Sequence, residues 1–251
     1  MQQSNTYVIV YSAVLTVILG LLLSGSAQIL GPRQQEAIAL DKKKQILGAV
    51  ISGEEIGVMT PDQVNEFYSK RIASSVVDIN GKEITEGGVT AEKVEIAKDY
   101  KKPADQRAYP VFIYHADGNP DDVESYIFPL YGAGLWDAIW GYIALDTDMN
   151  TIGGITLAHA SETPGLGARI TESEVQGRYV GKKIFDESGE LVAVQMMKGE
   201  GKDYSSDLHK VDGMSGATIT GNGVNNMLKA YLSHYEAYIK AKSSTSAVAG
   251  L

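Results

Sequence analysis

The sequence predicts an α+β fold, with one N-terminal transmembrane helix followed by a domain of antiparallel sheet with flanking helices. Three patterns support this prediction. The first is a long apolar run at the N-terminus, with no charged side chain before Arg33. The second is a series of short β-like segments separated by turn residues. The third is an amphipathic helical pattern near the C-terminus, whose apolar face needs a core to pack on.

The composition excludes several functions. The chain has 251 residues, a net charge of −9 and a pI of about 5.0, which disfavours nucleic acid as a partner because binding it requires neutralised phosphates. It has no cysteine, which excludes disulfides, cysteine-ligated iron–sulfur clusters and thiol nucleophiles. The four histidines lack metal-ligand spacing, and we predict no metal site. A redox role would need an organic cofactor or a metal held by other ligands.

The apolar run over residues 7–30 exceeds the roughly 20 residues needed to cross a bilayer. We therefore expect a retained single-pass anchor in contact with membrane lipid. A cleaved signal peptide is the alternative, with residues 24–27 as a small-residue cleavage site, but its start would lack positive side chains. Arg33 and the lysines at 42–44 follow the run, and the positive-inside rule would place them in the cytoplasm.

Helices are predicted at three places after the anchor. Pro32 suits the first turn of a juxtamembrane helix that runs towards Ala49. Thr60 and Gln63 form a capping-box pattern around a proline. The third helix has apolar residues at helical spacing: Val224, Met227, Leu228, Tyr231, Leu232, Tyr235, Tyr238 and Ile239. Residues 242–251 are expected to form a flexible tail.

Strands are predicted where β-branched and aromatic residues stand between turn signals. Residues 76–84 are expected to form a hairpin around an Asn-Gly turn, and residues 85–107 a surface loop with a short helix. The other predicted strands are residues 109–115, 125–130, 140–145, 152–159 and 191–197, with a turn at 117–120.

The stretch over residues 212–221 reads Asp-Gly-Met-Ser-Gly-Ala-Thr-Ile-Thr-Gly and leads into the C-terminal helical pattern. A loop that enters a helix N-terminus offers unpaired backbone N–H groups and the positive end of the helix dipole, which suit a phosphate. Thr220 or Asn222 could cap that helix. The alternative is a plain capped turn without a ligand.

Two more loops have unusual sequences. Residues 131–136 read Tyr-Gly-Ala-Gly-Leu-Trp, which indicates a tight bend against a flat ring, although a buried structural tryptophan gives the same pattern. Residues 162–167 read Glu-Thr-Pro-Gly-Leu-Gly, in which proline and glycine fix a particular backbone course.

These loops together resemble one protein family. Asp212 and the Ser-Gly-Ala-Thr at 215–218 resemble the flavinylation motif of FMN-binding domains in respiratory sodium pumps. The Gly-Leu-Trp at 134–136, the Gly-Tyr-x-Ala-Leu at 141–145 and the loop at 162–167 resemble the NqrC-like subunits of the sodium-translocating NADH:quinone reductase. The resemblance covers the anchor and the C-terminal half. Residues 35–105 match little, and Gly-Ala-Gly at 132–134 departs from the shorter glycine pair expected there.

The resemblance implies a covalent cofactor. In this family the FMN phosphate is esterified to the last threonine of the motif, here Thr218, and Thr220 is a rival hydroxyl outside the motif. A magnesium-dependent flavin transferase attaches the FMN, and Asp212 would be recognised by that enzyme. Lys198 would stabilise reduced anionic flavin, or it is a solvated charge at a strand end. The expected cofactor contacts are Leu135, Trp136, Glu162, Thr163, Leu166, Gly167, Lys198, Ser215, Gly216 and Ala217.

The resemblance further implies an electron-carrier subunit, which relays electrons from NADH towards quinone and is catalytically incomplete without the other subunits. Its domain would face the periplasm at a bacterial inner membrane, in conflict with the positive-inside rule. No dinucleotide fingerprint is present, so the chain is not expected to bind NADH itself. Two alternatives stay open. One is the equivalent subunit of the Rnf-type ferredoxin:NAD pump, and the other is an anchored binding module without a redox role.

These expectations divide the chain into four segments. Residues 1–31 are the transmembrane anchor, and 32–107 are the juxtamembrane and N-terminal part of the soluble domain. Residues 108–241 form the FMN-binding domain, and 242–251 the tail.

Overall fold

The computed structural model of the chain describes residues 4–85, 88–116, 119 and 121–249, with side chains to residue 244 in the last helix. Most of the predicted turn at 117–120 lies outside the described residues. The chain forms two compact units, Met1–Lys42 and Lys43–Leu251.

The first unit is an apolar helix. It is most of α1 (Asn5–Gly48), which contains a window with a mean hydropathy of 2.3, long and apolar enough to cross a membrane. No residue of that window is buried by the described part of the chain, whereas Ile46 and Leu47 at the end of α1 are buried. Pro32 lies inside α1 and does not begin a second helix, so the predicted separate juxtamembrane helix is wrong. A proline removes one backbone donor, and here the turns on both sides of it continue the helix.

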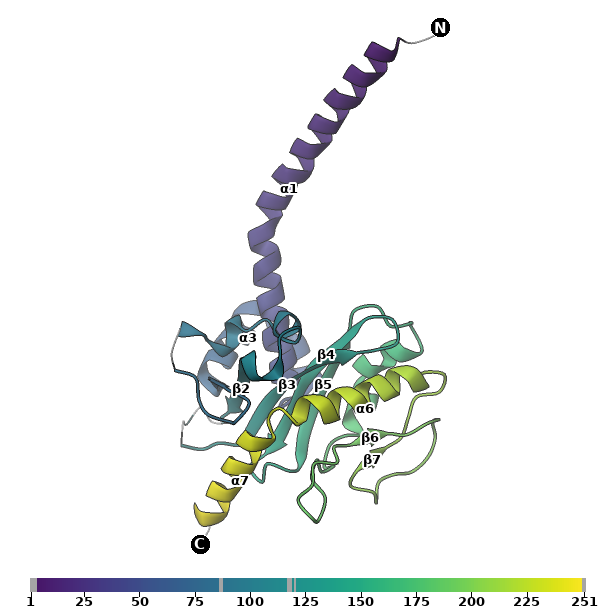
Figure 1. Cartoon of the computed structure of the whole chain (residues 1–251). Coiled ribbons are helices and arrows are strands. Elements are labelled where there is room, and N and C mark those ends of the chain that lie inside the picture. Colours follow the sequence, from purple (N-terminus) through teal and green to yellow (C-terminus); the bar gives the residue numbers. More distant parts are fainter. Residues whose placement is uncertain (1–3, 86–87, 117–118, 120, 250–251) are drawn as a thin grey trace. The chain divides into compact units, whose positions relative to one another are not determined.

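The second unit is an α+β domain (Figure 1). It is built on a five-stranded antiparallel sheet in the order β1-β2-β3-β4-β5. Each strand pairs with the next along the chain, as the hairpin-rich sequence predicts. A second, parallel pair joins β6 to β7. The strands are β1 (Ile72–Val77), β2 (Tyr109–Tyr114), β3 (Ser125–Ala133), β4 (Ala138–Asp146), β5 (Ile152–His159), β6 (Gln195–Met196) and β7 (Lys210–Val211).

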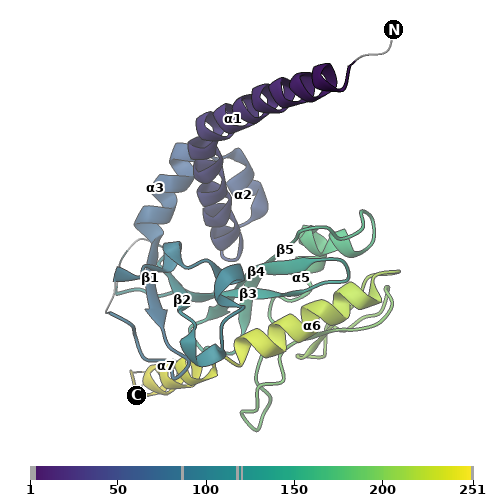
Figure 2. The ribbon, with the colours of Figure 1, turned by 45° about the horizontal axis from the view of Figure 1, so that its top comes forward.

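Successive side chains of β4 point to opposite faces of the sheet. On one face, Ile139 and Ile143 belong to the large core that α6 (Thr218–Leu232) covers. On the other face, Trp140 Nε1 donates a 3.1 Å hydrogen bond to Oε1 of Gln45, in the last turns of α1. Figure 2 shows α6 on one side of the sheet, and α2 (Gly53–Val58) and α3 (Pro61–Arg71) on the other.

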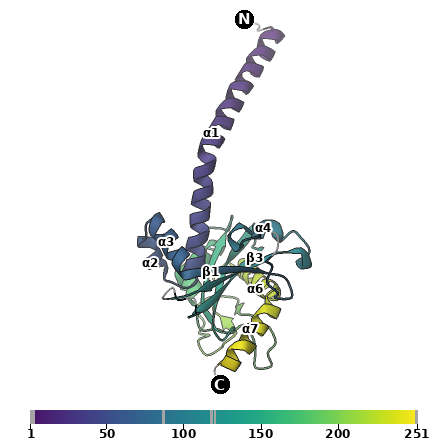
Figure 3. The same ribbon diagram turned by 90° about the vertical axis from the view of Figure 1, so that its left-hand side faces the viewer.

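The C-terminal helical pattern is split into two helices. α6 ends at Leu232, and α7 (Glu236–Ala249) follows after a turn (Figure 3). The turn lets the buried Tyr235 donate a 2.9 Å hydrogen bond to the Pro110 carbonyl and pack on Phe128. α7 continues through most of the segment expected to be a tail. The remaining short helices are η2 (Ala91–Lys93), α4 (Ile96–Asp99), η3 (Ala104–Gln106), η4 (Gly167–Thr171) and α5 (Ser173–Gly177).

The capping box at the start of α3 is confirmed. Thr60 N donates to Gln63 Oε1 at 2.8 Å, and Gln63 N donates to Thr60 Oγ1 at 3.4 Å. The hairpin predicted over residues 76–84 is present in short form, with Gly81 at φ 77° in its turn. Of the strand predicted over residues 191–197, only the short β6 forms, because Ala193 has φ 57° and interrupts the extended chain.

Candidate cofactor pocket

Three loops meet at a pocket of about 270 Å³ at the N-terminus of α6. They are the β3–β4 connection, the loop after β5, and the loop of residues 212–217 that precedes α6. Most of the predicted contact residues meet here, although they lie far apart in sequence. The pocket is lined by Leu135, Glu162, Thr163, Leu166, Gly167, Gly216, Ala217, Thr218, Ile219 and Thr220.

Glu162 is the side chain that joins these loops. Its Oε1 accepts hydrogen bonds from the backbone N–H groups of Leu135 at 2.8 Å and Trp136 at 3.0 Å. Its Oε2 accepts a 2.6 Å hydrogen bond from the hydroxyl of Thr220. The residue is only 4% exposed, so its carboxylate is shielded from solvent at the pocket wall and fixes the positions of the loops.

The hydrogen bonds also determine the charge of Glu162. Burial alone would raise the pKa of this carboxyl group, because burial disfavours the charged form. The Thr220 hydroxyl and the N–H groups of Trp136 and Leu135 outweigh burial and hold the pKa below its usual value. Glu162 is therefore a buried carboxylate that stays ionised at neutral pH.

Glycines make room for this carboxylate. A Cβ at Gly134 would collide with Oε1 of Glu162, and a Cβ at Gly167 would collide with its Oε2 and with the Thr220 hydroxyl. The Gly-Ala-Gly at 132–134 is thus explained by packing. Gly132 lies against Met227 of α6, and a Cβ there would stand 2.8 Å from the Met227 Cβ.

Thr218 is the first residue of α6 and is half-buried. The N-cap position is Ala217, which has no side-chain hydrogen bond to the helix. The predicted caps Thr220 and Asn222 both lie inside the helix, so that prediction is wrong. The helix begins earlier than expected because Gly216, at φ 73°, turns the chain directly into it. The first turn of α6 therefore presents uncapped N–H groups at the pocket.

Trp136 is not part of the pocket lining, but it stands at the rim through its contact with Thr163, which lines the pocket. Its side chain is 69% exposed, and its Nε1 donates a 3.1 Å hydrogen bond to the Thr163 hydroxyl. Leu135 and Leu166 are 44% and 41% exposed and give the pocket apolar walls. Ile219, which the sequence did not single out, is 59% exposed beside Thr218.

Ser215 and Asp212 lie outside the pocket lining. The backbone N–H of Ser215 donates a 3.1 Å hydrogen bond to Oε2 of Glu200. The Asp212 side chain is turned inward, where Oδ2 accepts a 2.6 Å hydrogen bond from Gly201 N. Its Oδ1 is buried and has no hydrogen-bond partner among the described residues.

Glu200 belongs to an ion cluster that the sequence did not predict. Arg169 donates to both of its carboxylate oxygens, at 2.7 and 2.9 Å, and Arg178 donates to Oε1 at 3.2 Å. The bond from Arg169 and the bond from Ser215 N lower the pKa of Glu200 to about 2. No local motif relates these residues, so only the folded chain reveals the cluster.

Lys198 is exposed and is not part of the pocket lining. It follows β6 in a bend, and the carbonyls of its two neighbours, Met197 and Gly199, pack against Gly213. This contact places Lys198 beside the 212–217 loop.

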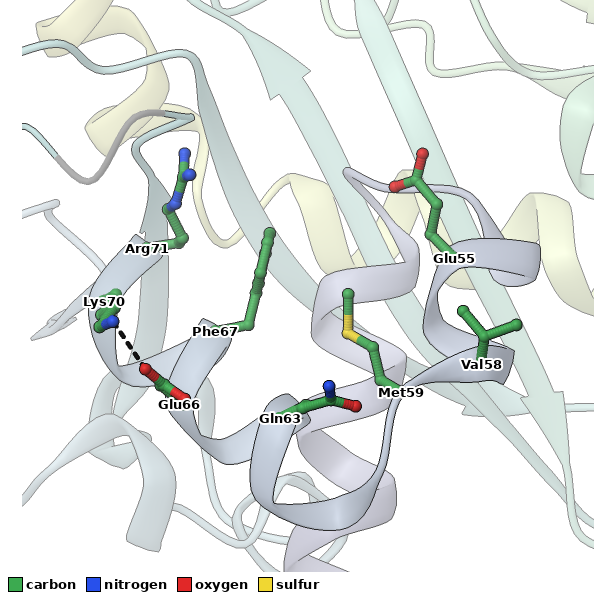
Figure 4. A pocket seen from close by; sticks show the side chains of 8 residues that line it. All are labelled: Glu55, Val58, Met59, Gln63, Glu66, Phe67, Lys70 and Arg71. Atoms are coloured by element: carbon green, nitrogen blue, oxygen red, sulfur yellow. Dashed lines mark hydrogen bonds and ion pairs between the residues drawn. The ribbon is translucent and has the colours of Figure 1, made fainter.

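A larger hollow of about 560 Å³ lies between α2 and α3 (Figure 4). Val58, Met59 and Phe67 form its apolar part, and the Glu66–Lys70 ion pair of 2.7 Å lies at its edge. None of the motif residues lines it, and it has no uncapped helix start comparable to that of α6, because Ser52 and Thr60 cap the helices beside it.

Comparisons with known proteins agree with this location. A family model described as the FMN-binding domain matches residues 134–233, a range that includes all three pocket loops. The C subunit of the Na(+)-translocating NADH-quinone reductase of Yersinia pestis is 32% identical over 231 residues, covering 87% of this chain and 85% of its own length. Its counterpart from Pseudomonas aeruginosa is 32% identical over 250 residues, covering 92% of each chain.

Solved structures share the fold. The crystal structure of the C subunit of the Na(+)-translocating NADH-quinone reductase from Parabacteroides distasonis matches with a TM-score of 0.69 and 34% identity, over 84% of this chain and 96% of that one. The structure of NqrC from Shewanella oneidensis matches with a TM-score of 0.69 and 24% identity, over 83% of this chain and 99% of that one.

Proposed function

The chain belongs to the NqrC family, the C subunits of Na(+)-translocating NADH-quinone reductases, and on that basis we propose that it is the electron-carrier subunit of such a complex, with FMN esterified through its phosphate to Thr218. In this role it passes electrons that originate from NADH on towards quinone, together with the other subunits. All the relatives described above are NADH-quinone reductase subunits, which favours this complex over an Rnf-type pump.

The position of Thr218 supports the proposal most directly. It lies at the start of α6, on the wall of the pocket, where no side chain caps the helix in the described part of the chain. Uncapped N–H groups and the helix dipole stabilise a phosphate anion at such a place. Gly216 keeps the pocket beside Thr218 free of a side chain, since a Cβ there would stand 2.8 Å from Leu166 Cδ2. The residues present therefore fit a phosphate joined to Thr218.

The other residues have distinct roles in this proposal. The flavin supplies the electron-transfer chemistry that the chain's side chains lack. Leu135 and Leu166 offer it apolar contact, and Trp136, bonded to Thr163, would shield it at the rim. Both oxygens of Glu162 accept hydrogen bonds from the protein, so this residue holds the loops in position and does not bind the flavin through a free oxygen. Lys198 lies beside the 212–217 loop, from which its cation would stabilise reduced anionic flavin.

The attachment step is a transfer of FMN from FAD by a magnesium-dependent flavin transferase. The Thr218 hydroxyl oxygen bonds to the phosphorus of the FMN half, the bond from that phosphorus to the bridging oxygen breaks, AMP leaves, and the hydroxyl proton is released. Any residue at 218 must therefore carry a hydroxyl group.

We also propose that α1 anchors the subunit in a bacterial inner membrane with its domain on the periplasmic side. A covalent link suits that location, because a tether keeps the cofactor at high local concentration where released FMN would be lost. The division into an anchor over 1–31, an FMN-binding domain over 108–241 and a connecting part between them belongs to the same proposal.

The proposal is tested by expressing the chain with an active flavin transferase and fully denaturing it. Flavin fluorescence on the separated polypeptide is expected for wild type and Thr218→Ser, and not for Thr218→Ala. A Thr218→Ala chain that keeps covalent flavin would contradict the attachment site. A wild-type chain without flavin, beside a control substrate that is labelled, would contradict the carrier function.

A further inference from the structure

The loop that leads to Thr218 is folded inward. Met214 is 2% exposed and Ala217 is 5% exposed. Gly213 is packed so closely that a Cβ would collide with the carbonyl oxygens of Met197 and Gly199. Ser215 and Gly216 of the 212–217 loop are exposed to solvent, and Asp212 is partly buried.

Asp212 is partly buried, and one of its two carboxylate oxygens is fully buried. Oδ2 accepts its hydrogen bond from Gly201 N, and Oδ1 has an accessible area below 1 Å². An enzyme that approaches the folded domain therefore cannot reach Oδ1 of Asp212, nor the buried Met214 that lies between Asp212 and Thr218 in the chain. Recognition of the whole Asp212 carboxylate together with Thr218 would require the loop to move.

Glu200, Arg169 and Arg178 hold the 212–217 loop in this folded, closed position, and we call these three residues the Glu200 clamp. Glu200 accepts the hydrogen bond from Ser215 N and is itself held by Arg169 through a bidentate pair. Arg178 donates to the carbonyl of Gly213 at 2.6 Å and to the carbonyl of Asp212 at 3.3 Å. These charge-assisted bonds fasten the loop backbone to η4, to the C-cap of α5 and to the segment after β6.

One feature of the closed loop favours its opening, namely the buried Oδ1 of Asp212, which is unpaired within the described part of the chain. A buried carboxylate oxygen without a hydrogen-bond donor is unfavourable, and opening the loop would return Asp212 Oδ1 to water. Gly216, at φ 73°, provides a flexible joint between the loop and α6. The hydrogen bonds of the clamp favour the closed loop, and the buried Asp212 oxygen favours the open loop. Because the two effects oppose each other, the loop can open locally while the sheet stays folded.

We propose that the flavin transferase modifies Thr218 only when the 212–217 loop has opened, and that the Glu200 clamp determines how often it opens. This inference rests on the proposed function, since it requires that Thr218 is the acceptor. Glu200 is thus a residue outside the attachment motif that governs the rate of attachment. Because attachment takes place in the open state, the clamp closes the loop over a completed site.

The test compares the purified, flavin-free full chain in three forms: wild type, Glu200→Gln and Glu187→Gln. Glu187 is an exposed glutamate in a separate turn and provides the matched control. Each form is incubated with transferase, FAD and Mg²⁺, and the flavinylated fraction is followed by intact mass. Glu200→Gln keeps the side-chain shape but loses the negative charge that holds both arginines, so we expect labelling at least about threefold faster than wild type. Glu187→Gln should match wild type.

A second measurement reports on the loop itself. Hydrogen exchange of the Met214 and Ser215 amides is expected to be faster in Glu200→Gln than in wild type, while amides in the centre of α6 are unchanged. Arg169→Gln removes the bidentate partner of Glu200 and should act in the same direction. In wild type alone, these loop amides should exchange by local opening, faster than the amides of α6.

The outcomes separate the two proposals. Equal labelling rates in all three forms, slower labelling in Glu200→Gln, or unchanged exchange of the loop amides would each overturn the clamp. Absence of labelling in every form, with the transferase active on a control substrate, would instead overturn Thr218 as acceptor and the inference with it.

Discussion

The Thr220 hydroxyl donates a 2.6 Å hydrogen bond to Oε2 of Glu162, and both residues are buried. Thr218, two residues earlier, is half-buried at the start of the same helix. The two threonines of this helical turn therefore have different environments. One stabilises the fold, and the other is positioned for modification.

This difference predicts opposite effects of the same substitution. Thr220→Val leaves a buried carboxylate oxygen without its donor, and we expect it to lower the free energy of unfolding by about 1–3 kcal/mol. Thr218→Val should change it by less than about 0.5 kcal/mol. Urea unfolding of the flavin-free chains measures both. Covalent flavin should be retained by Thr220→Val and lost by Thr218→Val, and the reverse pattern would refute the assignment.

Glu162 should make stability depend on pH. Its pKa in the folded chain lies below the ordinary value of 4.5, so its contribution is present above pH 4.5 and is lost as pH falls through the folded pKa. The stability difference between wild type and Glu162→Gln should therefore be largest at neutral pH and shrink on acidification below about 4.5. Urea unfolding across this range tests it. A difference that stays constant with pH would show that the charge of Glu162 is unimportant.

Gly132 should not tolerate a side chain. A Cβ there would stand 2.8 Å from the Met227 Cβ and push α6 away from β3. We expect Gly132→Ala to lower the free energy of unfolding by about 1–3 kcal/mol. Gly177→Ala is the matched control, because no atom lies within 4 Å of its added Cβ. Thermal unfolding of both variants should show a lower midpoint for Gly132→Ala only.

The end of α1 should belong to the folded domain. Ile46 is 1% exposed and Leu47 is fully buried, and Gln45 bonds to Trp140. A chain that starts at Lys43 is expected to be folded and to leave the membrane fraction. A chain that starts at Ser52 loses these contacts and should unfold at a lower urea concentration. Equal midpoints for the two truncated chains would argue against this boundary.

Local sequence signals predicted a substantial part of the fold. The capping box at Thr60 and the strands β2 to β5 depend on neighbouring residues, and the structure confirms them. The strand predicted over residues 191–197 is shortened to β6, because Ala193 adopts a positive φ that its residue type does not indicate. The break between α6 and α7 was not predicted because it depends on the distant partners of Tyr235, Pro110 and Phe128.

The site, like the fold, was predicted only where the signal lies in neighbouring residues. Resemblance identified the loops around Thr218 and Glu162, because their glycine and proline patterns are local. It did not show that Asp212 is turned inward, or that Glu200 pairs with Arg169 and Arg178. Charged side chains that meet only after folding leave no periodic or motif signal in the chain.

The fluorescence of the two tryptophans can report on two different parts of the domain. Trp136 stands at the pocket rim, whereas Trp140 bonds to Gln45 on the opposite side of the same hairpin. In a Trp140→Phe chain, all indole emission would come from the rim of the pocket. Because a flavin absorbs where indole emits, loading of the site would be visible as quenching in real time. The complementary Trp136→Phe chain would report on the attachment of the α1 end to the sheet instead.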